Sequence, residues 1–349
     1  MFSGGEEEDR TPDLRIANAT LSQLSYPPTA TRSVAKSGAA SAARTGVAHR
    51  HTVELRAAGD VPVSRDVRMS RYDTAWLDLQ FNNRARVPEH PAIFDRWARE
   101  SALARERHAR RLDLPYGTSA GERLDLFPTH RRDAPVLVFI HGGWWRSLDK
   151  NDHSFIAPAF AAAGALVVVP NYALCPAVTI DTIALQMTQA LAWVHRHAAL
   201  YGGDPRRIVV AGHSAGGHLA AMLACCDWKR VGAELPARLL TAAVSISGLF
   251  DLEMIRQTPY LHGLGLTPAS ARRLSPLHYP APRTPLSAFV GALESDGFLQ
   301  QNDAIRAAWG RRAVPVCERI ADAHHFDVLH RLADPRSPLH AHVLGLLGL

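Results

Sequence analysis

The stretch Arg207–Cys226, which reads R-I-V-V-A-G-H-S-A-G-G-H-L-A-A-M-L-A-C-C, decides the fold. Ile208–Val210 is a run of β-branched apolar residues, which is typical of a buried strand. An Ala/Leu/Met-rich helical pattern begins just after Ser214. The serine therefore lies on a turn between a strand and a helix. Gly212 and Gly216 flank it, and a turn this sharp needs glycine there because side chains would collide with neighbouring backbone.

A second glycine motif lies upstream of this turn. Val136–Trp145 reads V-L-V-F-I-H-G-G-W-W, a buried-strand pattern that runs into His141, Gly142 and Gly143. The backbone N–H groups of such a glycine turn can point at a developing oxyanion. The residue after the nucleophile supplies a further N–H group, so Ala215 is the third expected donor. The two motifs together predict a nucleophilic serine beside an oxyanion-binding loop.

The composition indicates a globular protein with a substantial core. The chain has 349 residues, of which 47% are apolar, enough for a large α/β domain. Its net charge of +6 comes mainly from scattered arginines rather than from a basic run, so we expect a solvated surface and no nucleic-acid partner. No apolar run reaches the length of a membrane span, so we expect no membrane partner.

Cysteine and histidine spacing gives no sign of a metal site or a disulfide framework. The four cysteines (Cys175, Cys225, Cys226 and Cys317) form no C-x-x-C motif. We interpret them as structural thiols in a reducing, cytoplasmic compartment. The close histidine pairs lack Cys, Asp or Glu at ligand spacing, so we expect neither a metal nor a cofactor. The sequence leaves the oligomeric state open, a homodimer included.

The first 68 residues differ in character from the rest. After an acidic cluster at Glu6–Asp9, Ser, Thr, Ala, Gly and Pro dominate without sustained periodicity. We expect this segment, residues 1–68, to be disordered, or to be an over-extended gene model with translation starting at Met69. The catalytic domain would then span residues 69–349.

A polar motif opens the expected domain. Leu77–Arg84 reads L-D-L-Q-F-N-N-R. Asp78, Asn82, Asn83 and Arg84 would fix an N-terminal lid over the mouth of the site. An ordinary polar turn that leads into a surface helix explains the same residues equally well.

Strands and helices alternate over the rest of the chain. This alternation favours an α/β fold with a mostly parallel central sheet and helices on both faces. Residues 252–285 are irregular and rich in Leu, Pro and His, which indicates a small cap insertion rather than a core element. From the apolar periodicity, the expected strands are Arg123–Phe127, Pro135–Ile140, Leu166–Val169, Ile208–Val210, Leu239–Ser247, Pro285–Gly291 and Val314–Ala321, and the expected helices are Pro91–Arg111, His153–Ala163, Thr179–Tyr201, the segment after Ser214, Asp303–Arg311 and a last one from Ser337.

A serine hydroxyl is a weak nucleophile at neutral pH, so Ser214 needs a base within hydrogen-bond reach and an acid that anchors the base. On a strand-to-helix turn of this type, the acid and then the histidine follow the serine along the chain. The loop after the last strand offers two histidines. We favour His325 as the base because Phe326 and Asp327 can pin the loop, and His324 is the alternative.

Three carboxylates are candidates for the acid. Glu294 and Asp296 follow the strand that ends at Gly291, in the segment G-A-L-E-S-D-G-F. Asp251 follows the preceding strand, but its position favours a helix cap, since Asp is a preferred N-cap residue. Spacing alone leaves Glu294 and Asp296 open.

Several short motifs of this chain occur together in one known family. They are Leu77-Asp78-x-Gln80-Phe81-Asn82-Asn83-Arg84, His141-Gly142-Gly143-x-Trp145, Asn171-Tyr172-x-Leu174-Cys175-Pro176, Gly212-His213-Ser214-Ala215-Gly216-Gly217-His218, Ser247-Gly248-x-x-Asp251-Leu252, Glu294-Ser295-x-x-Phe298 and His325-Phe326-Asp327. From about Tyr72 to the C-terminus, this combination resembles the kynurenine formamidase (arylformamidase) branch of the α/β-hydrolases.

The resemblance carries implications for the site and the reaction. In that branch the acid is often an aspartate directly before a serine, and here Glu294, one methylene longer, stands in that position. The resemblance thus implies Glu294 as the acid, in a triad with Ser214 and His325. It also implies hydrolysis of N-formylkynurenine to kynurenine and formate, without a metal or a cofactor.

Aromatic residues near the glycine turn bear on the substrate. Trp144, Trp145 and Tyr172 could bracket an aromatic ring and restrict the acyl side to a small group, although core packing explains each ring equally well. We therefore expect a small-molecule substrate, either an aryl formamide or a short-chain ester. A short-chain carboxylesterase is the first alternative function, and a hydrolase fold kept only for ligand binding is the second.

Overall fold

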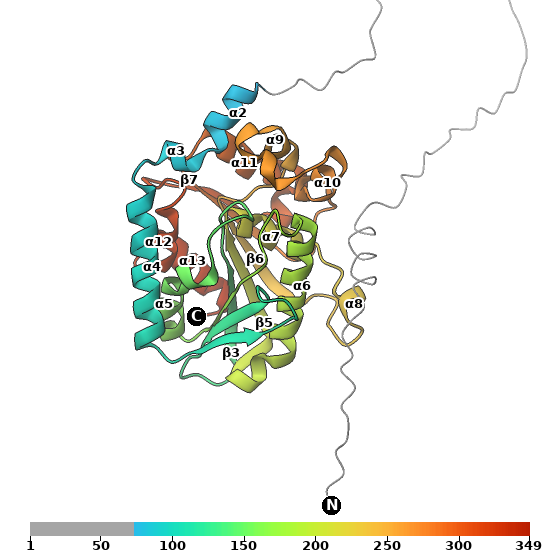
Figure 1. The fold of residues 1–349 in the computed structure, drawn as a ribbon. Coiled ribbons are helices and arrows are strands. Elements are labelled where there is room, and N and C mark those ends of the chain that lie inside the picture. Colours follow the sequence, from blue (N-terminus) through green and yellow to red (C-terminus); the bar gives the residue numbers. More distant parts are fainter. Residues whose placement is uncertain (1–72) are drawn as a thin grey trace, which may run out of the picture. The chain divides into compact units, whose positions relative to one another are not determined.

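A computed structural model of the chain describes residues 73–349 (Figure 1). The expected N-terminal extension, residues 1–68, and the expected start at Met69 lie outside the described residues. Within them, the chain alternates between strands and helices for most of its length.

The centre of the fold is an eight-stranded sheet with the strand order β1-β2-β4-β3-β5-β6-β7-β8. β1 and β2 are antiparallel to their neighbours, and all other pairs are parallel. The mostly parallel sheet expected from the sequence is therefore confirmed. The strands are β1 (Arg111–Pro115), β2 (Arg123–Phe127), β3 (Ala134–Ile140), β4 (Leu166–Pro170), β5 (Gly203–His213), β6 (Leu240–Ile246), β7 (Leu286–Gly291) and β8 (Val316–Ile320).

Helices cover both faces of the sheet because successive side chains of each buried strand point to opposite faces. Val136, Val138 and Ile140 of β3 join one apolar core, whereas Leu137 and Phe139 join the other. The first core packs against α6 (Ile180–His197), α7 (Ala215–Ala224) and α11 (Asp296–Ala313), and the second against α5 (Ala157–Ala163), α12 (Val328–Ala333) and α13 (Pro338–Leu347) (Figure 1).

Several expected helices have different bounds in the structure; α5, for example, begins at Ala157 rather than His153. The charged helix α4 (His90–Arg107) ends before Arg111, which instead begins the edge strand β1. The strand β1 was not predicted because it is mostly exposed and therefore lacks a buried apolar run. Helix α11 starts at Asp296 rather than Asp303, since the Ser295 hydroxyl caps it by accepting a hydrogen bond from the Phe298 N–H group.

Short helices gather beyond the carboxyl ends of the parallel strands. Residues 252–285, expected to be irregular, contain α9 (Leu252–Gln257), the 3-10 helix η4 (Pro259–Leu264), α10 (Pro268–Arg273) and the 3-10 helix η5 (Pro276–His278). The first helices of the described chain, α2 (Thr74–Phe81) and α3 (Asn83–Arg86), lie at the same end, where α2 contacts α9, η4 and α11 (Figure 1). As expected, Asp251 caps α9 by accepting a hydrogen bond from the Glu253 N–H group.

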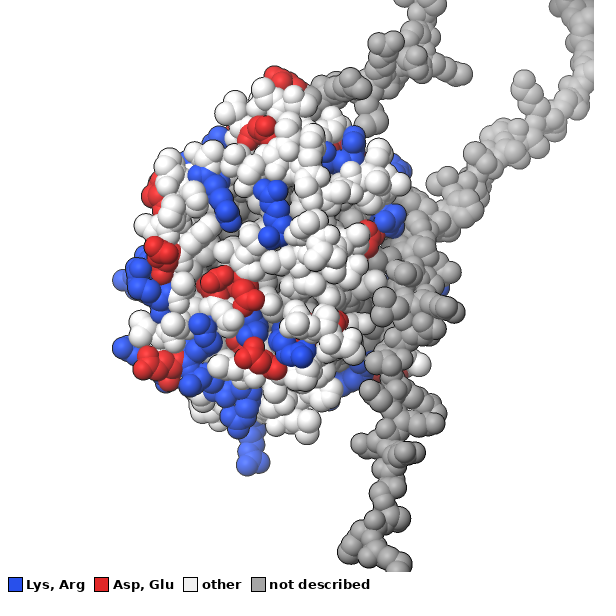
Figure 2. Space-filling view, in the orientation of Figure 1, with Lys and Arg blue, Asp and Glu red and all other residues white. Residues whose placement is uncertain are grey.

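The remaining elements are short connections. They are the 3-10 helices η1 (Lys150–Asp152), η2 (Ser154–Ile156) and η3 (Ala198–Tyr201), and the helix α8 (Trp228–Val231). None of the helices in residues 73–349 is long and apolar enough to cross a membrane. On the face drawn in Figure 2, Lys and Arg side chains are interspersed with Asp and Glu.

Candidate active site

Ser214 lies on the turn between β5 and α7, as predicted from the sequence. Its backbone is left-handed, with φ 55° and ψ −116°, which is strained for any residue other than glycine. A Cβ atom at Gly212 would lie 2.1 Å from the Gly216 carbonyl oxygen, and one at Gly216 would lie 2.1 Å from the Ile140 carbonyl oxygen. The two glycines are thus required by close backbone contacts, which hold the serine at the carboxyl end of the sheet.

Glu294 and His325 meet through a short hydrogen bond. Glu294 follows β7, His325 follows β8, and the His325 Nδ1–H group donates to Glu294 Oε2 over 2.6 Å. The other carboxylate oxygen, Oε1, accepts hydrogen bonds from the Ser247 hydroxyl at 2.5 Å and from the Gly291 N–H group at 2.8 Å. Both side chains are buried, so Oε1 anchors the carboxylate while Oε2 fixes the imidazole.

The two alternative residues lie elsewhere. Asp296 is exposed in the first turn of α11. The His324 ring faces its own loop, where Nδ1 lies 3.3 Å from Asp327 Oδ1. Of the two histidines and three carboxylates weighed from the sequence, the structure brings together His325 and Glu294.

Ser214 and His325 line the same small cavity, with a volume of about 30 Å³. Phe298 packs against the His325 ring at a centroid distance of 4.5 Å. His213, the residue before the serine, lies 2.7 Å from the His325 carbonyl oxygen through its Nε2 atom. Burial lowers the pKa of His213 well below its usual value, so a neutral His213 donates to that carbonyl and holds the loop beside Ser214.

His213 and Ser247 were not singled out from the sequence. His213 fills the variable position of the G-x-S-x-G pattern, and Ser247 stands in a Ser-Gly pair at the end of a strand. Neither position indicates by itself which residue it contacts. Their role becomes visible only when β5, β6, β7 and the last loop are assembled.

The expected oxyanion loop packs directly against the serine. A Cβ atom at Gly142 would lie 3.1 Å from the Ser214 Cβ atom, and Gly143 has a positive φ of 102°. The Tyr172 hydroxyl lies 2.9 Å from the His141 carbonyl oxygen and so holds this loop from behind. Within residues 73–349, no protein acceptor is hydrogen-bonded to the N–H groups of Gly142, Gly143 or Ala215.

Of the three aromatic residues expected at the substrate, only Trp144 lines the cavity. The other two expectations need correction, because Trp145 and Tyr172 are 0% and 1% exposed and do not line it. The Trp145 ring packs edge-on against His218 at 5.1 Å, and the Tyr172 ring stacks on His141 at 4.2 Å. These two rings are core residues that support the glycine loop.

Comparison with known proteins shows the family to which the chain belongs. A solved structure from Silicibacter sp. TM1040, whose thioesterase assignment is itself provisional, is 32% identical; the match covers 76% of this chain and 97% of that one, with a TM-score of 0.67. A family model described as BD-FAE matches residues 124–261. The chain belongs to the α/β-hydrolase superfamily.

Curated relatives of this α/β-hydrolase include formamidases and esterases. The kynurenine formamidase of Danio rerio is 28% identical over 246 residues, which cover 68% of the hydrolase and 82% of that protein. The esterase LipQ of Mycobacterium tuberculosis is 34% identical over 151 residues, which cover 40% of the hydrolase and 35% of that protein. The likeness to a formamidase therefore extends over more of the chain than the likeness to this esterase.

The N-terminal segment of the hydrolase forms part of the cavity wall. Asn83 and Arg84 line the cavity beside Ser214. Gln80 fastens the segment to the start of α11, because its carbonyl oxygen accepts from the Ser295 hydroxyl at 2.7 Å and its side-chain oxygen accepts from the Gly297 N–H group at 2.9 Å. Asp78, a residue of the hypothesised lid, accepts a hydrogen bond from the Tyr260 N–H group at 2.9 Å.

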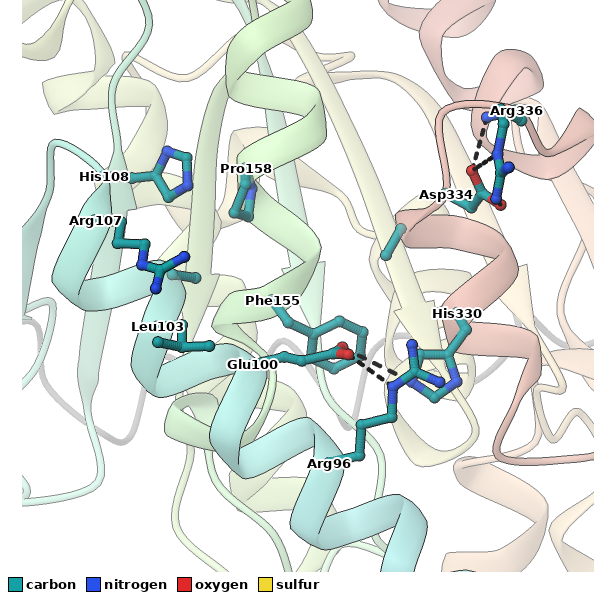
Figure 3. Close-up of a pocket in the computed structure, with 12 residues that line it drawn as sticks. Arg96, Glu100, Leu103, Arg107, His108, Phe155, Pro158, His330, Asp334 and Arg336 are labelled. Carbon is teal, nitrogen blue, oxygen red and sulfur yellow. Dashed lines mark hydrogen bonds and ion pairs between the residues drawn. The ribbon is translucent and has the colours of Figure 1, made fainter.

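A larger cavity of about 460 Å³ lies between α4 and α12 (Figure 3). Its charged side chains are partly paired with one another, Arg96 with Glu100 and Arg336 with Asp334 (Figure 3). Neither Ser214 nor His325 lines it, so the small cavity is the candidate active site of the hydrolase. In residues 73–349, no group of three or more His, Cys, Asp or Glu side chains is arranged to hold a metal ion.

Proposed function

We propose that this α/β-hydrolase is an arylformamidase that cleaves N-formylkynurenine to kynurenine and formate. Ser214 is the nucleophile, His325 the general base and Glu294 the acid that orients His325. The observation that carries the proposal is the small cavity shared by Ser214 and His325, with Glu294 bonded to the far side of the imidazole.

The proposed reaction passes through an acyl-enzyme. His325 Nε2 takes the proton of Ser214 as the serine oxygen bonds to the formyl carbon, and the carbonyl electron pair moves to the oxygen. The N–H groups of Gly142, Gly143 and Ala215 stabilise this oxyanion, and each such donor is typically worth about 100- to 1000-fold in rate. When the C–N bond breaks, His325 gives its proton to the aniline nitrogen, and water then repeats the sequence to release formate.

The size of the cavity favours a very small acyl group. Its volume is about 30 Å³, whereas sites for drug-sized ligands typically have about 300 to 1000 Å³. Trp144, Phe94 and Trp97 contribute large rings to its wall, and the Trp144 ring is itself packed against Phe81 and Phe298. Formyl is the smallest acyl group, so it fits such a wall better than a longer chain does.

A short-chain carboxylesterase is the second candidate function. The same three residues would cleave an ester by the same steps. The esterase LipQ of Mycobacterium tuberculosis is 34% identical to this chain over 151 residues. An ester oxygen leaves more readily than an aniline nitrogen, so a site that cleaves formamides also cleaves reactive formate esters. The two functions therefore differ in preference rather than in machinery.

We further propose that residues 69–349 form one catalytic domain and that residues 252–285 cap the site. The Asp78 carboxylate and the Arg146 guanidinium both bond the backbone of Tyr260, at 2.9 and 3.1 Å. The Arg146 guanidinium also lies over the Tyr260 ring at 4.5 Å. These contacts tie the proposed cap to the N-terminal segment and to the loop after the oxyanion glycines.

Steady-state kinetics on a substrate panel test the proposed function. The panel holds N-formylkynurenine and the p-nitrophenyl esters of formate, acetate and butyrate, each rate being divided by that of the uncatalysed reaction. We expect the largest acceleration for N-formylkynurenine and a steep fall in kcat/KM from formate to butyrate. A preference for acetate or butyrate esters by orders of magnitude would identify a carboxylesterase, and ligand binding without any turnover would identify a binding protein.

A further inference from the structure

Arg84 is the one permanently charged side chain among the residues that line the cavity beside Ser214 in the described part of the chain. It is exposed and still lines the cavity, so it stands at the mouth. A group that leaves from the acyl carbon and is too large for the cavity must pass through this mouth. Arg84 is therefore placed to contact the leaving group rather than the acyl group.

The charge of Arg84 is uncompensated within residues 73–349. No described carboxylate lies within 4.0 Å of its guanidinium. Its described contacts are a hydrogen bond to the Ser147 hydroxyl at 3.3 Å and the Phe94 ring, whose centroid lies 5.6 Å away. A guanidinium has five N–H donors in a planar fork that matches a carboxylate, and most of these donors face no protein acceptor here.

Asn83 adds a second, independent observation at the same wall. It is 4% exposed and lines the cavity, yet its Nδ2 atom is buried without a hydrogen-bond partner in the described chain. A buried N–H group without an acceptor costs free energy, which a polar ligand would recover. Two adjacent residues of α3 that line this cavity thus carry N–H groups without an acceptor in the described chain.

We infer that Arg84 binds the carboxylate of the kynurenine leaving group and so sets the preference for an anionic substrate, with Asn83 as a second donor at the same wall. This inference rests on the proposed function and assigns a specificity-determining residue to that site. The aromatic ring lies at the mouth against Phe94 and Trp144, the formyl group enters the cavity, and the carboxylate reaches the guanidinium.

A pair of substrates that differ in one charge tests the inference. They are 4-(2-formamidophenyl)-4-oxobutanoate and its primary carboxamide, which share the ring and the scissile bond. We expect wild type to favour the carboxylate in kcat/KM by about 10- to 100-fold, the range of a charge-assisted hydrogen bond. In Arg84→Leu this ratio should fall to near one. Arg86→Leu, on the same helix but outside the lining of this cavity, should retain the wild-type ratio.

Calorimetric binding of the two deformylated products, the anion and its amide, gives a readout that needs no turnover. We expect Arg84→Leu to weaken binding of the anion about 10- to 100-fold, and Asn83→Ala to weaken it less. Equal binding of anion and amide by wild type, or a wild-type ratio in Arg84→Leu, would overturn the inference. Tight binding of the anion without hydrolysis of any formamide would instead refute the proposed function while still supporting a carboxylate site at Arg84.

Discussion

The carboxylate of Glu294 lies 2.6 Å from Nδ1 of His325, and both side chains are almost fully buried. The Oε1 atom of Glu294 accepts hydrogen bonds from the Ser247 hydroxyl and the Gly291 N–H group. A carboxylate fixed in this way keeps the imidazole in the tautomer that leaves Nε2 free to accept a proton. The extra methylene of glutamate, relative to the aspartate of the resembled family, is thus accommodated by bonds on both sides.

Replacing Glu294 should damage turnover, and replacing Asp296 should not. We expect Glu294→Gln to lower kcat by about 10³- to 10⁴-fold, since loss of the orienting acid has that scale in related triads. Asp296→Asn should stay close to wild type because this side chain is exposed in the first turn of α11. Steady-state kinetics on both variants check this, and the reverse order would reassign the acid.

Ser247 should act as a positioning residue for Glu294. Ser247→Ala removes one of the two hydrogen bonds to Oε1, and we expect a fall in kcat of roughly 10-fold, the scale of one charge-assisted hydrogen bond, with little change in KM. Ser245→Ala is the matched control, because the Ser245 hydroxyl is buried on β6, two residues before Ser247, without a hydrogen-bond partner in the described chain. Equal kcat values for the two variants would show that Ser247 does not position Glu294.

Part of the fold follows from local sterics and was therefore predictable from the sequence. The turn at Ser214 needs glycine at two fixed positions, and this requirement leaves a visible pattern between a β-branched run and a helical run. The buried strands of the sheet were recognisable for the same reason, since each is a continuous apolar segment. The exposed edge strand β1 has no such segment and was missed.

Other features depend on directions that a sequence does not contain. Glu294 and Asp296 are two residues apart in the chain. Glu294 faces His325 and Asp296 is exposed only because the turn after β7 packs against the loop that carries His325. Trp144 and Trp145 are adjacent in the chain, yet one lines the cavity and the other lies in the core. His213 contacts a carbonyl more than a hundred residues further along the chain, so its role could not be read locally.

Adding one methyl group at the serine turn should be far more harmful than adding it elsewhere. In Gly216→Ala the new Cβ would lie 2.1 Å from the Ile140 carbonyl oxygen, so we expect loss of activity and a clear drop in Tm. Gly345→Ala is the control, because that glycine lies within α13 and a Cβ there meets nothing within 4 Å. It should raise stability by about 0.5 to 1 kcal/mol. Thermal unfolding that ranks the two variants in the opposite order would contradict the close-contact argument.

Buried neutral histidines should make the fold sensitive to mild acid. Burial lowers the pKa of His153 to about 3 and that of His218 to about 4, whereas an unfolded histidine titrates near 6.5. Below that pH these histidines bind protons in the unfolded chain but stay neutral in the folded chain. Each such histidine therefore removes about 1.4 kcal/mol of unfolding free energy per pH unit until its folded pKa is reached.

Urea unfolding between pH 7.5 and pH 5 measures this acid sensitivity. We expect the free energy of unfolding to be highest above pH 6.5 and to fall steadily below it. His218→Gln should reduce the slope by about one proton, and His130→Gln, at an exposed position, should leave the slope unchanged. Equal wild-type stability at pH 5 and pH 7.5 would show that these histidines take up protons within the folded state.

Covalent labelling of Ser214 tests the central claim, that Glu294 and His325 activate this serine, most directly. Wild type is mixed with a small alkyl fluorophosphonate, the adduct is located by peptide mass mapping, and its rate of formation is measured. We predict a single adduct on Ser214 that forms orders of magnitude more slowly in His325→Ala and in Glu294→Gln. An adduct on another residue, or an undiminished rate in His325→Ala, would contradict the account.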